Sequence, residues 1–420
     1  MAYLSCNVHL ILILALSALA RAAAAQDATP QPGTMPPDAR REWTVTWDNR
    51  PSVRYGDLVR IDVRARFTGE LRDSGVSVRD RDTSHFDIAR RRIGVAGAIG
   101  RRAEFQIERE LGSSRPWRDV YLDYRGFEDV SIQAGQFKLP FGLDENTSST
   151  NIDFVYRSRA ATLSPGRDPG VMAHGRAGVL RYEAGVFTRD GDNGRDDRTA
   201  VFAGVTPAAR LVVQPFRGST TSMFEDFQAG VAFTTGNTPA GLADVRGPTA
   251  LGRPFLREEF GIQGTRRRVG VEMRWRPGPL SVQSEYVRLS TERRGQSVEN
   301  TDLPPLSASA WYVHGTWVLT GEEKARGADE PTRPLFDGGF GSIELAARIE
   351  AARFSSAGDG LPGTGPRAET ILPHRDRALT LGVNWSLNRW IRLQANLVRD
   401  TMSISSSSFW SRAVRLRFAM

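Results

Sequence analysis

Cysteine and lysine are almost absent from this chain of 420 residues, which has one cysteine, Cys6, and two lysines, Lys138 and Lys324. A single cysteine excludes an intramolecular disulfide and a zinc site built from several thiolates. The five histidines lie far apart in the sequence, which argues against a metal centre. No G-x-S-x-G nucleophile elbow and no phosphate-cradling glycine-rich loop before a helix stands out. We therefore expect no catalytic residues, no cofactor and no metal.

Long apolar runs are also missing, apart from one near the start. Leu10–Leu19 reads "LILILALSAL", an apolar core of signal-peptide length that is too short to span a bilayer. "ARAAAAQ" follows, so we predict a signal peptide over residues 1–25 that is cleaved before Gln26. Residues 26–41 are rich in proline and polar side chains and are interpreted as a mobile tail. An exported chain without membrane helices is periplasmic, secreted, or an outer-membrane barrel.

The rest of the chain, 42–420, alternates apolar and polar residues. "RIDVRARFT" (60–68), "RRRVGVEMRWR" (266–276) and "AVRLRFAM" (413–420) each place apolar side chains on one face and charged ones on the other. Segments of about ten residues with this pattern are typical of transmembrane β-strands. A soluble antiparallel sandwich alternates in the same way and is the competing interpretation.

Two features favour the barrel. The polar faces are dense in arginine, as a water-filled lumen allows, and the connections alternate in length. "SLNRW" (386–390) reads as a tight turn, whereas 234–264 and 351–376 read as long loops rich in glycine and proline. We therefore predict an all-β, transmembrane antiparallel β-barrel of about 16 strands with an inward-folded constriction loop.

The constriction is predicted after "GQFKLPFG" (135–142). A strand pattern ends there and a stretch without lasting period follows, so residues 139–169 are the candidate loop. Lys138 has the parity of the lipid-facing side chains of its strand, which is costly for a charge. We therefore expect the strand to break before it, with Pro140 and Gly142 turning the chain inward.

Several blocks resemble one family. "VSIQAGQFKLPFGLDENTSSTNIDFVYRS" (130–158), "PGRDPGVMAHG" (165–175), "WVLTGEEK" (317–324), "GGFGSIELAARIE" (338–350) and "DLVRIDVRARF" (57–67) are similar to segments of the phosphate-selective porins of the O and P type. The resemblance implies a 16-stranded, usually trimeric outer-membrane barrel with a basic pore, which takes up small anions such as phosphate or polyphosphate. The scarcity of lysine departs from the family pattern, so a general or non-phosphate diffusion porin remains the alternative.

Arginine suits such a pore because guanidinium is always charged and its planar fork matches phosphate and carboxylate oxygens. An outer-membrane barrel enzyme and a secreted β-rich binding protein are the less favoured alternatives. Expected partners are small anions, outer-membrane lipid and two further copies in a homotrimer, and no nucleic acid. The predicted pore-lining residues are Arg60, Arg64, Arg66, Arg90, Arg92, Lys138, Arg157, Arg159, Arg167, Arg268 and Arg274; strand parity also places Arg266, Arg348, Arg392, Arg415 and Arg417 on the polar face.

Overall fold

The computed structural model describes residues 42–47, 49–73, 84–113, 116–189, 204–219, 223–243, 260–324, 330–358, 363, 365–403 and 407–420. The predicted signal peptide and the proline-rich tail lie outside these residues. Within the described ranges, no helix has the length and apolar character needed to cross a bilayer.

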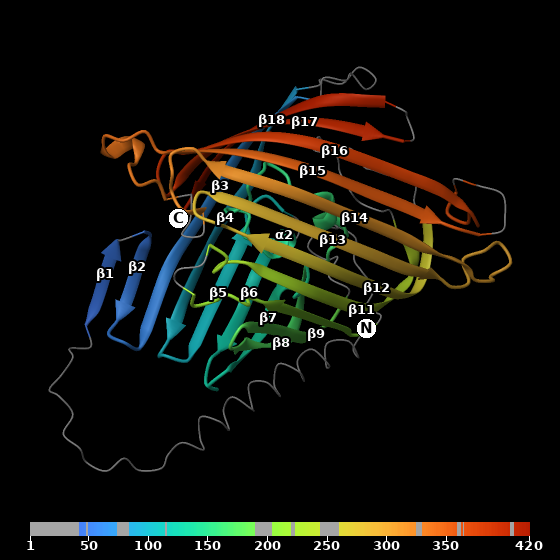
Figure 1. Cartoon of the computed structure of the whole chain (residues 1–420). Coiled ribbons are helices and arrows are strands. Elements are labelled where there is room, and N and C mark those ends of the chain that lie inside the picture. Colours follow the sequence, from blue (N-terminus) through green and yellow to red (C-terminus); the bar gives the residue numbers. More distant parts are fainter. Residues whose placement is uncertain are drawn as a thin grey trace, which may run out of the picture.

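Antiparallel strands form nearly all of the structure (Figure 1). Strands β3 to β18 pair in sequence order, and β18 pairs back with β3, which closes a ring. The predicted barrel of sixteen antiparallel strands is therefore confirmed. Its strands are β3 (Val59–Asp73), β4 (Ser84–Ile99), β5 (Ala103–Glu110), β6 (Trp117–Tyr124), β7 (Val130–Lys138), β8 (Arg167–Ala177), β9 (Leu180–Phe187), β10 (Thr206–Val213), β11 (Gln228–Ala243), β12 (Phe260–Trp275), β13 (Leu280–Arg293), β14 (Leu303–Val318), β15 (Ser342–Ser356), β16 (Ile371–Ser386), β17 (Ile391–Met402) and β18 (Ser407–Ala419).

Two further strands, β1 (Trp43–Trp47) and β2 (Pro51–Tyr55), form a hairpin outside the ring. β2 pairs with the first residues of β3, whereas β18 pairs with the later residues of β3 from Arg66 onward. The hairpin therefore continues the wall below the end of β18 and lies beside β3 in Figure 1.

Burial follows strand parity with the apolar side outward. On β12, Val269 and Val271 are 48% and 51% exposed, whereas the alternating residue Arg268 is only 2% exposed. A soluble sandwich would bury the valines instead, because its core lies between apolar faces. Exposed aliphatic and buried charged side chains are the pattern of a barrel that has lipid outside and a polar interior.

The two long loops predicted at 234–264 and 351–376 are shorter in the structure. β11 extends to Ala243 and β12 begins at Phe260, and β15 extends to Ser356 before β16 begins at Ile371. The glycine-rich and proline-rich ends of these strands still pair across bulges, for example between Thr238 and Gly241. Bulges break the apolar–polar alternation without ending the strand, which is why the sequence pattern failed there.

Residues 139–166 connect β7 to β8 and fold into the barrel, where they form the short helices α2 (Leu143–Asn146) and α3 (Arg159–Leu163) (Figure 1). The predicted loop ended at 169, but β8 already begins at Arg167. We call residues 139–166 the lumen segment. A 3-10 helix, η2 (Leu335–Asp337), follows β14.

The lumen segment packs on an apolar patch of the inner wall, which the expectation of a polar interior missed. Phe141 and Leu163 lie in one buried cluster with side chains of β11 to β16, among them Tyr312 and Phe354. α3 contacts β13, β14 and β15. Apolar burial therefore holds the lumen segment against this half of the barrel and leaves the opposite half open.

Candidate functional site

The open half of the barrel encloses a cavity of about 1060 Å³. Its wall comes from β3 to β12, and the lumen segment closes the other side. Eleven basic and four acidic side chains line it, so the cavity has a strong excess of positive charge. The basic residues are Arg64, Arg66, Arg90, Arg92, Arg118, Lys138, Arg157, Arg167, Arg181, Arg210 and Arg274; the acidic residues are Glu108, Asp119, Glu145 and Glu183.

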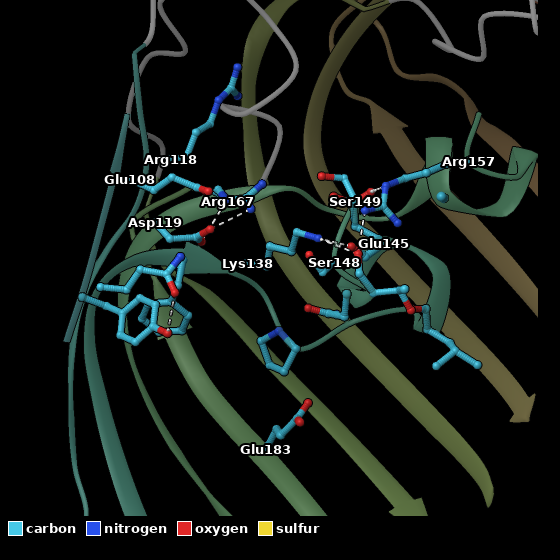
Figure 2. Close-up of a pocket in the computed structure, with 18 of the residues that line it drawn as sticks. Glu108, Arg118, Asp119, Lys138, Glu145, Ser148, Ser149, Arg157, Arg167 and Glu183 are labelled. Atoms are coloured by element: carbon cyan, nitrogen blue, oxygen red, sulfur yellow. Dashed lines mark hydrogen bonds and ion pairs between the residues drawn. The ribbon is translucent and has the colours of Figure 1, made fainter. Parts of the chain in front are cut away.

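Some of these arginines are compensated by carboxylates on neighbouring strands. Arg92 contacts Glu110 at 2.7 Å and Glu108 at 3.2 Å. Arg167 donates two hydrogen bonds of 2.9 Å to Asp119, a bidentate pair that Figure 2 shows in the cavity wall. Such pairs fix the side chains but offer little free charge to a passing ion.

Three arginines of the cavity, Arg64, Arg90 and Arg274, have no ion-pair partner among the described residues, and a fourth, Arg66, has only a long one. Arg64 donates to Gln106 at 2.6 Å, and Arg274 donates to Gln228 at 3.1 Å, both neutral acceptors. Arg66 donates to the Ser149 hydroxyl at 2.7 Å and lies 3.9 Å from Glu108. Arg90 has no hydrogen-bond or ion-pair partner in the described part of the chain. These side chains therefore keep most of their charge available to the lumen.

Lys138 lies at the boundary between wall and lumen segment. Its Nζ donates to the backbone carbonyl of Glu145 and, at 3.4 Å, to that of Thr147, so the side chain points into the lumen (Figure 2). Pairing of β7 with β6 ends at Gln136, two residues before Lys138, whereas pairing with β8 continues to Lys138 itself. β7 therefore includes Lys138, and the predicted break before this residue is wrong. The strand is released from β6 only, and the Lys138 side chain turns to the lumen at the last residue of the strand.

The lumen segment departs at Gly142, whose φ of 78° lies in the left-handed region that favours glycine. The next two backbone amides, of Leu143 and Asp144, donate to the Glu285 carboxylate of β13 at 3.1 Å each. The Glu285 carboxylate therefore binds the first turn of α2. Its sequence context, "SEYVR", gave no sign of this contact, because the partner lies more than 140 positions earlier.

A second attachment lies at the far end of the lumen segment. Arg159 contacts Asp376 and Asp400 at 2.8 Å each, and its backbone amide donates to Glu350 at 2.7 Å. Arg159 is only 4% exposed and is not among the residues that line the cavity. Its predicted place beside the ion path is therefore wrong, because three wall carboxylates draw it into the protein.

The second lysine, Lys324, attaches the middle of the lumen segment. It follows β14 and its Nζ contacts the Asp153 carboxylate at 2.5 Å. His314 contacts the other oxygen of Asp153 at 3.2 Å. Burial disfavours the charged carboxylate, yet Lys324 and His314 hold the pKa of Asp153 well below its usual range. Both lysines of the chain thus hold the lumen segment.

Of the eleven predicted residues, Arg64, Arg66, Arg90, Arg92, Lys138, Arg157, Arg167 and Arg274 line the cavity. Besides Arg159, two others do not. Arg60 is exposed near the start of β3 beside Asp62, and Arg268 is buried and donates to the Leu163 carbonyl at 3.0 Å. The prediction missed Arg118, Arg181 and Arg210. The alternation in "LRYEAGVF" and "TPAARLVV" would have indicated the last two.

Comparison with known proteins supports this fold. The family model "Phosphate-selective porin O and P" matches residues 61–407. Porin O of Pseudomonas aeruginosa is 24% identical over 385 residues, which cover 84% of each chain. Among solved structures, the anion-selective porin of Comamonas acidovorans aligns over 86% of this chain and 100% of its own, with 11% identity and a TM-score of 0.56. OmpT of Vibrio cholerae in its trimer form aligns over 87% and 100%, with 15% identity and a TM-score of 0.53.

The family model covers most of the barrel, from β3 to the start of β18. A closed antiparallel ring, an apolar outer face and a basic lumen accompany that match. The protein is an outer-membrane β-barrel porin, and the chain belongs to the phosphate-selective porin O and P family.

Proposed function

We propose that the protein is a passive channel for small anions across the outer membrane. The observation that carries the proposal is the cavity lining, with eleven basic against four acidic side chains and three arginines, Arg64, Arg90 and Arg274, without an ion-pair partner among the described residues. Anions entering such a lumen exchange lost hydration for guanidinium contacts. Passage requires each contact to be weak, and a series of single arginines on successive strands meets that condition better than one closed cage.

Phosphate-like oxyanions are the proposed preferred solutes. Guanidinium offers parallel donors to two oxygens of one anion, and the Thr147, Ser148 and Ser149 hydroxyls of the lumen segment border the same cavity. The family to which the chain belongs is described as phosphate-selective, and Porin O of Pseudomonas aeruginosa is a relative. Lys138 is the one lysine among the residues that line the cavity, so arginine supplies the other ten basic side chains.

A channel is favoured over an enzyme. The nearest approach to a catalytic pair in the described residues is His174 with Asp123, at 2.9 Å, and neither lines the cavity. We also propose a homotrimer, because one of the structures with the same fold is described as a trimer and the outer face of this barrel is apolar. Crosslinking of the detergent-extracted protein tests the trimer separately from the conductance.

Single-channel recording in a planar bilayer tests the proposed function. The purified, refolded chain should give stepwise conductance in potassium chloride, and added phosphate should reduce the chloride current by occupying the arginines. A matched control is the variant Arg64→Gln/Arg66→Gln/Arg90→Gln, in which phosphate should block less at the same concentration. Absence of conductance steps in a heat-modifiable, folded preparation contradicts the channel, and a chloride current unaffected by phosphate contradicts the preference.

A further inference from the structure

Five wall carboxylates are buried beneath the lumen segment. They come from β13, β15, β16 and β17, none is more than 5% exposed, and none borders the cavity. They are Glu285, Glu344, Glu350, Asp376 and Asp400. The acidic side chains of this half of the barrel are therefore separated from the basic half by the lumen segment.

Arg159 contacts three of these carboxylates, two through its side chain and one through its backbone amide. Its guanidinium contacts Asp376 and Asp400 at 2.8 Å each, and its amide donates to Glu350 at 2.7 Å. Arg348 supplies a second cation, 3.2 Å from Glu350. Three carboxylates thus face two guanidinium groups, and loss of either guanidinium leaves uncompensated negative charge.

This cluster lies close behind the cavity. Ala161 and Thr162, the residues two and three positions after Arg159 on α3, line the cavity, whereas Arg159 does not. The short helix α3 therefore contacts the carboxylates through Arg159 and borders the cavity through Ala161 and Thr162. Buried charges are screened less by salt than exposed ones, so uncompensated charge behind α3 acts on ions in the cavity.

We propose that Arg159 determines selectivity without touching the permeating ion, by neutralising the carboxylates behind α3. The lumen segment then does more than narrow the pore, because it carries this cation to the acidic wall and covers the cluster with α3. The inference rests on the proposed anion channel, and it assigns to Arg159 a positioning and compensating role instead of a place in the arginine series.

The test measures the ratio of chloride to potassium permeability from reversal potentials of folded channels. Arg159→Ala should lower the ratio by about twofold to tenfold, the effect of one unit charge at roughly 10 Å on two ions of opposite sign in a largely aqueous path. Arg159→Lys keeps the charge and should stay within about twofold of the wild type. The triple variant Arg159→Ala/Asp376→Asn/Asp400→Asn should return the ratio to the wild-type value or above it, because it removes one positive and two negative charges from the cluster.

An unchanged ratio in Arg159→Ala overturns the inference, and so does failure of the triple variant to recover, which would indicate direct contact with the ion. A wild-type channel that prefers potassium instead contradicts the proposed function. If Arg159→Ala does not fold into a barrel, the double variant Asp376→Asn/Asp400→Asn, with Arg159 intact, replaces it as the test of the inference. That variant has two fewer buried charges and should raise the ratio above wild type; an unchanged ratio overturns the inference as well.

Discussion

Removal of the Glu285 carboxylate should loosen the start of the lumen segment. Glu285→Ala leaves the amides of Leu143 and Asp144 without their acceptor, and both residues are buried. A buried amide without a partner costs about 1–3 kcal/mol, so the two together cost about 2–6 kcal/mol. The low end applies, because the wild type also has to desolvate Glu285 when the segment docks. About 2 kcal/mol corresponds to a roughly 30-fold more frequent local opening.

Hydrogen exchange of the folded barrel in detergent measures this opening. Amides of Leu143 and Asp144 should exchange about 30-fold faster in Glu285→Ala than in the wild type. Glu285→Gln keeps one acceptor oxygen and should show an intermediate rate. Amides of β16, which contacts the far end of the segment through Asp376, provide the internal reference. Unchanged exchange at Leu143 and Asp144 in Glu285→Ala would refute the argument that this carboxylate holds the first turn of α2.

Three further predictions concern the same region. Gly142→Ala should destabilise the docked segment by about 1–2 kcal/mol or more, seen as faster exchange of α2, because φ is positive and the new Cβ would lie 2.7 Å from a Glu285 oxygen; unaltered exchange contradicts this. Lys138→Glu should lower anion selectivity and increase current noise, since a carboxylate would face two carbonyl oxygens, while Lys138→Met should show mainly the noise; equal effects of both variants contradict a charge role. Arg90→Gln should lower the chloride-to-potassium ratio, whereas the paired variant Arg92→Gln/Glu110→Gln should leave it nearly unchanged, because it removes a compensated pair; the reverse order in bilayer recordings would show that ion pairing does not decide which arginine acts.

The alternation of side chains was enough to predict the barrel. The part of β12 from Arg268 to Trp275 shows it clearly, because lipid on one side and water on the other favour a period of two. Strand ends at bulges, such as that between Thr238 and Gly241, escaped the pattern. Gly142 was identified from local backbone chemistry, since a positive φ favours glycine, whereas the break predicted before Lys138 does not occur because β7 stays paired with β8 there.

Contacts across the barrel could not be predicted in this way. Arg159 has the composition and position of a pore arginine, and only the approach of Asp376 and Asp400, more than 200 residues later, shows that it is compensated. The apolar patch beneath Phe141 likewise comes from several distant strands. Parity tells which face a side chain occupies, but it does not tell what the lumen segment places over that face.

The most direct test of the account is the zero-current potential of the wild-type channel across a tenfold potassium chloride gradient at neutral pH. A lumen in which eleven basic side chains face four acidic ones should give a potential with the sign of chloride permeation. Raising the salt on both sides should reduce its magnitude, because screening weakens the arginine field. A potential with the sign of potassium permeation would contradict the central claim.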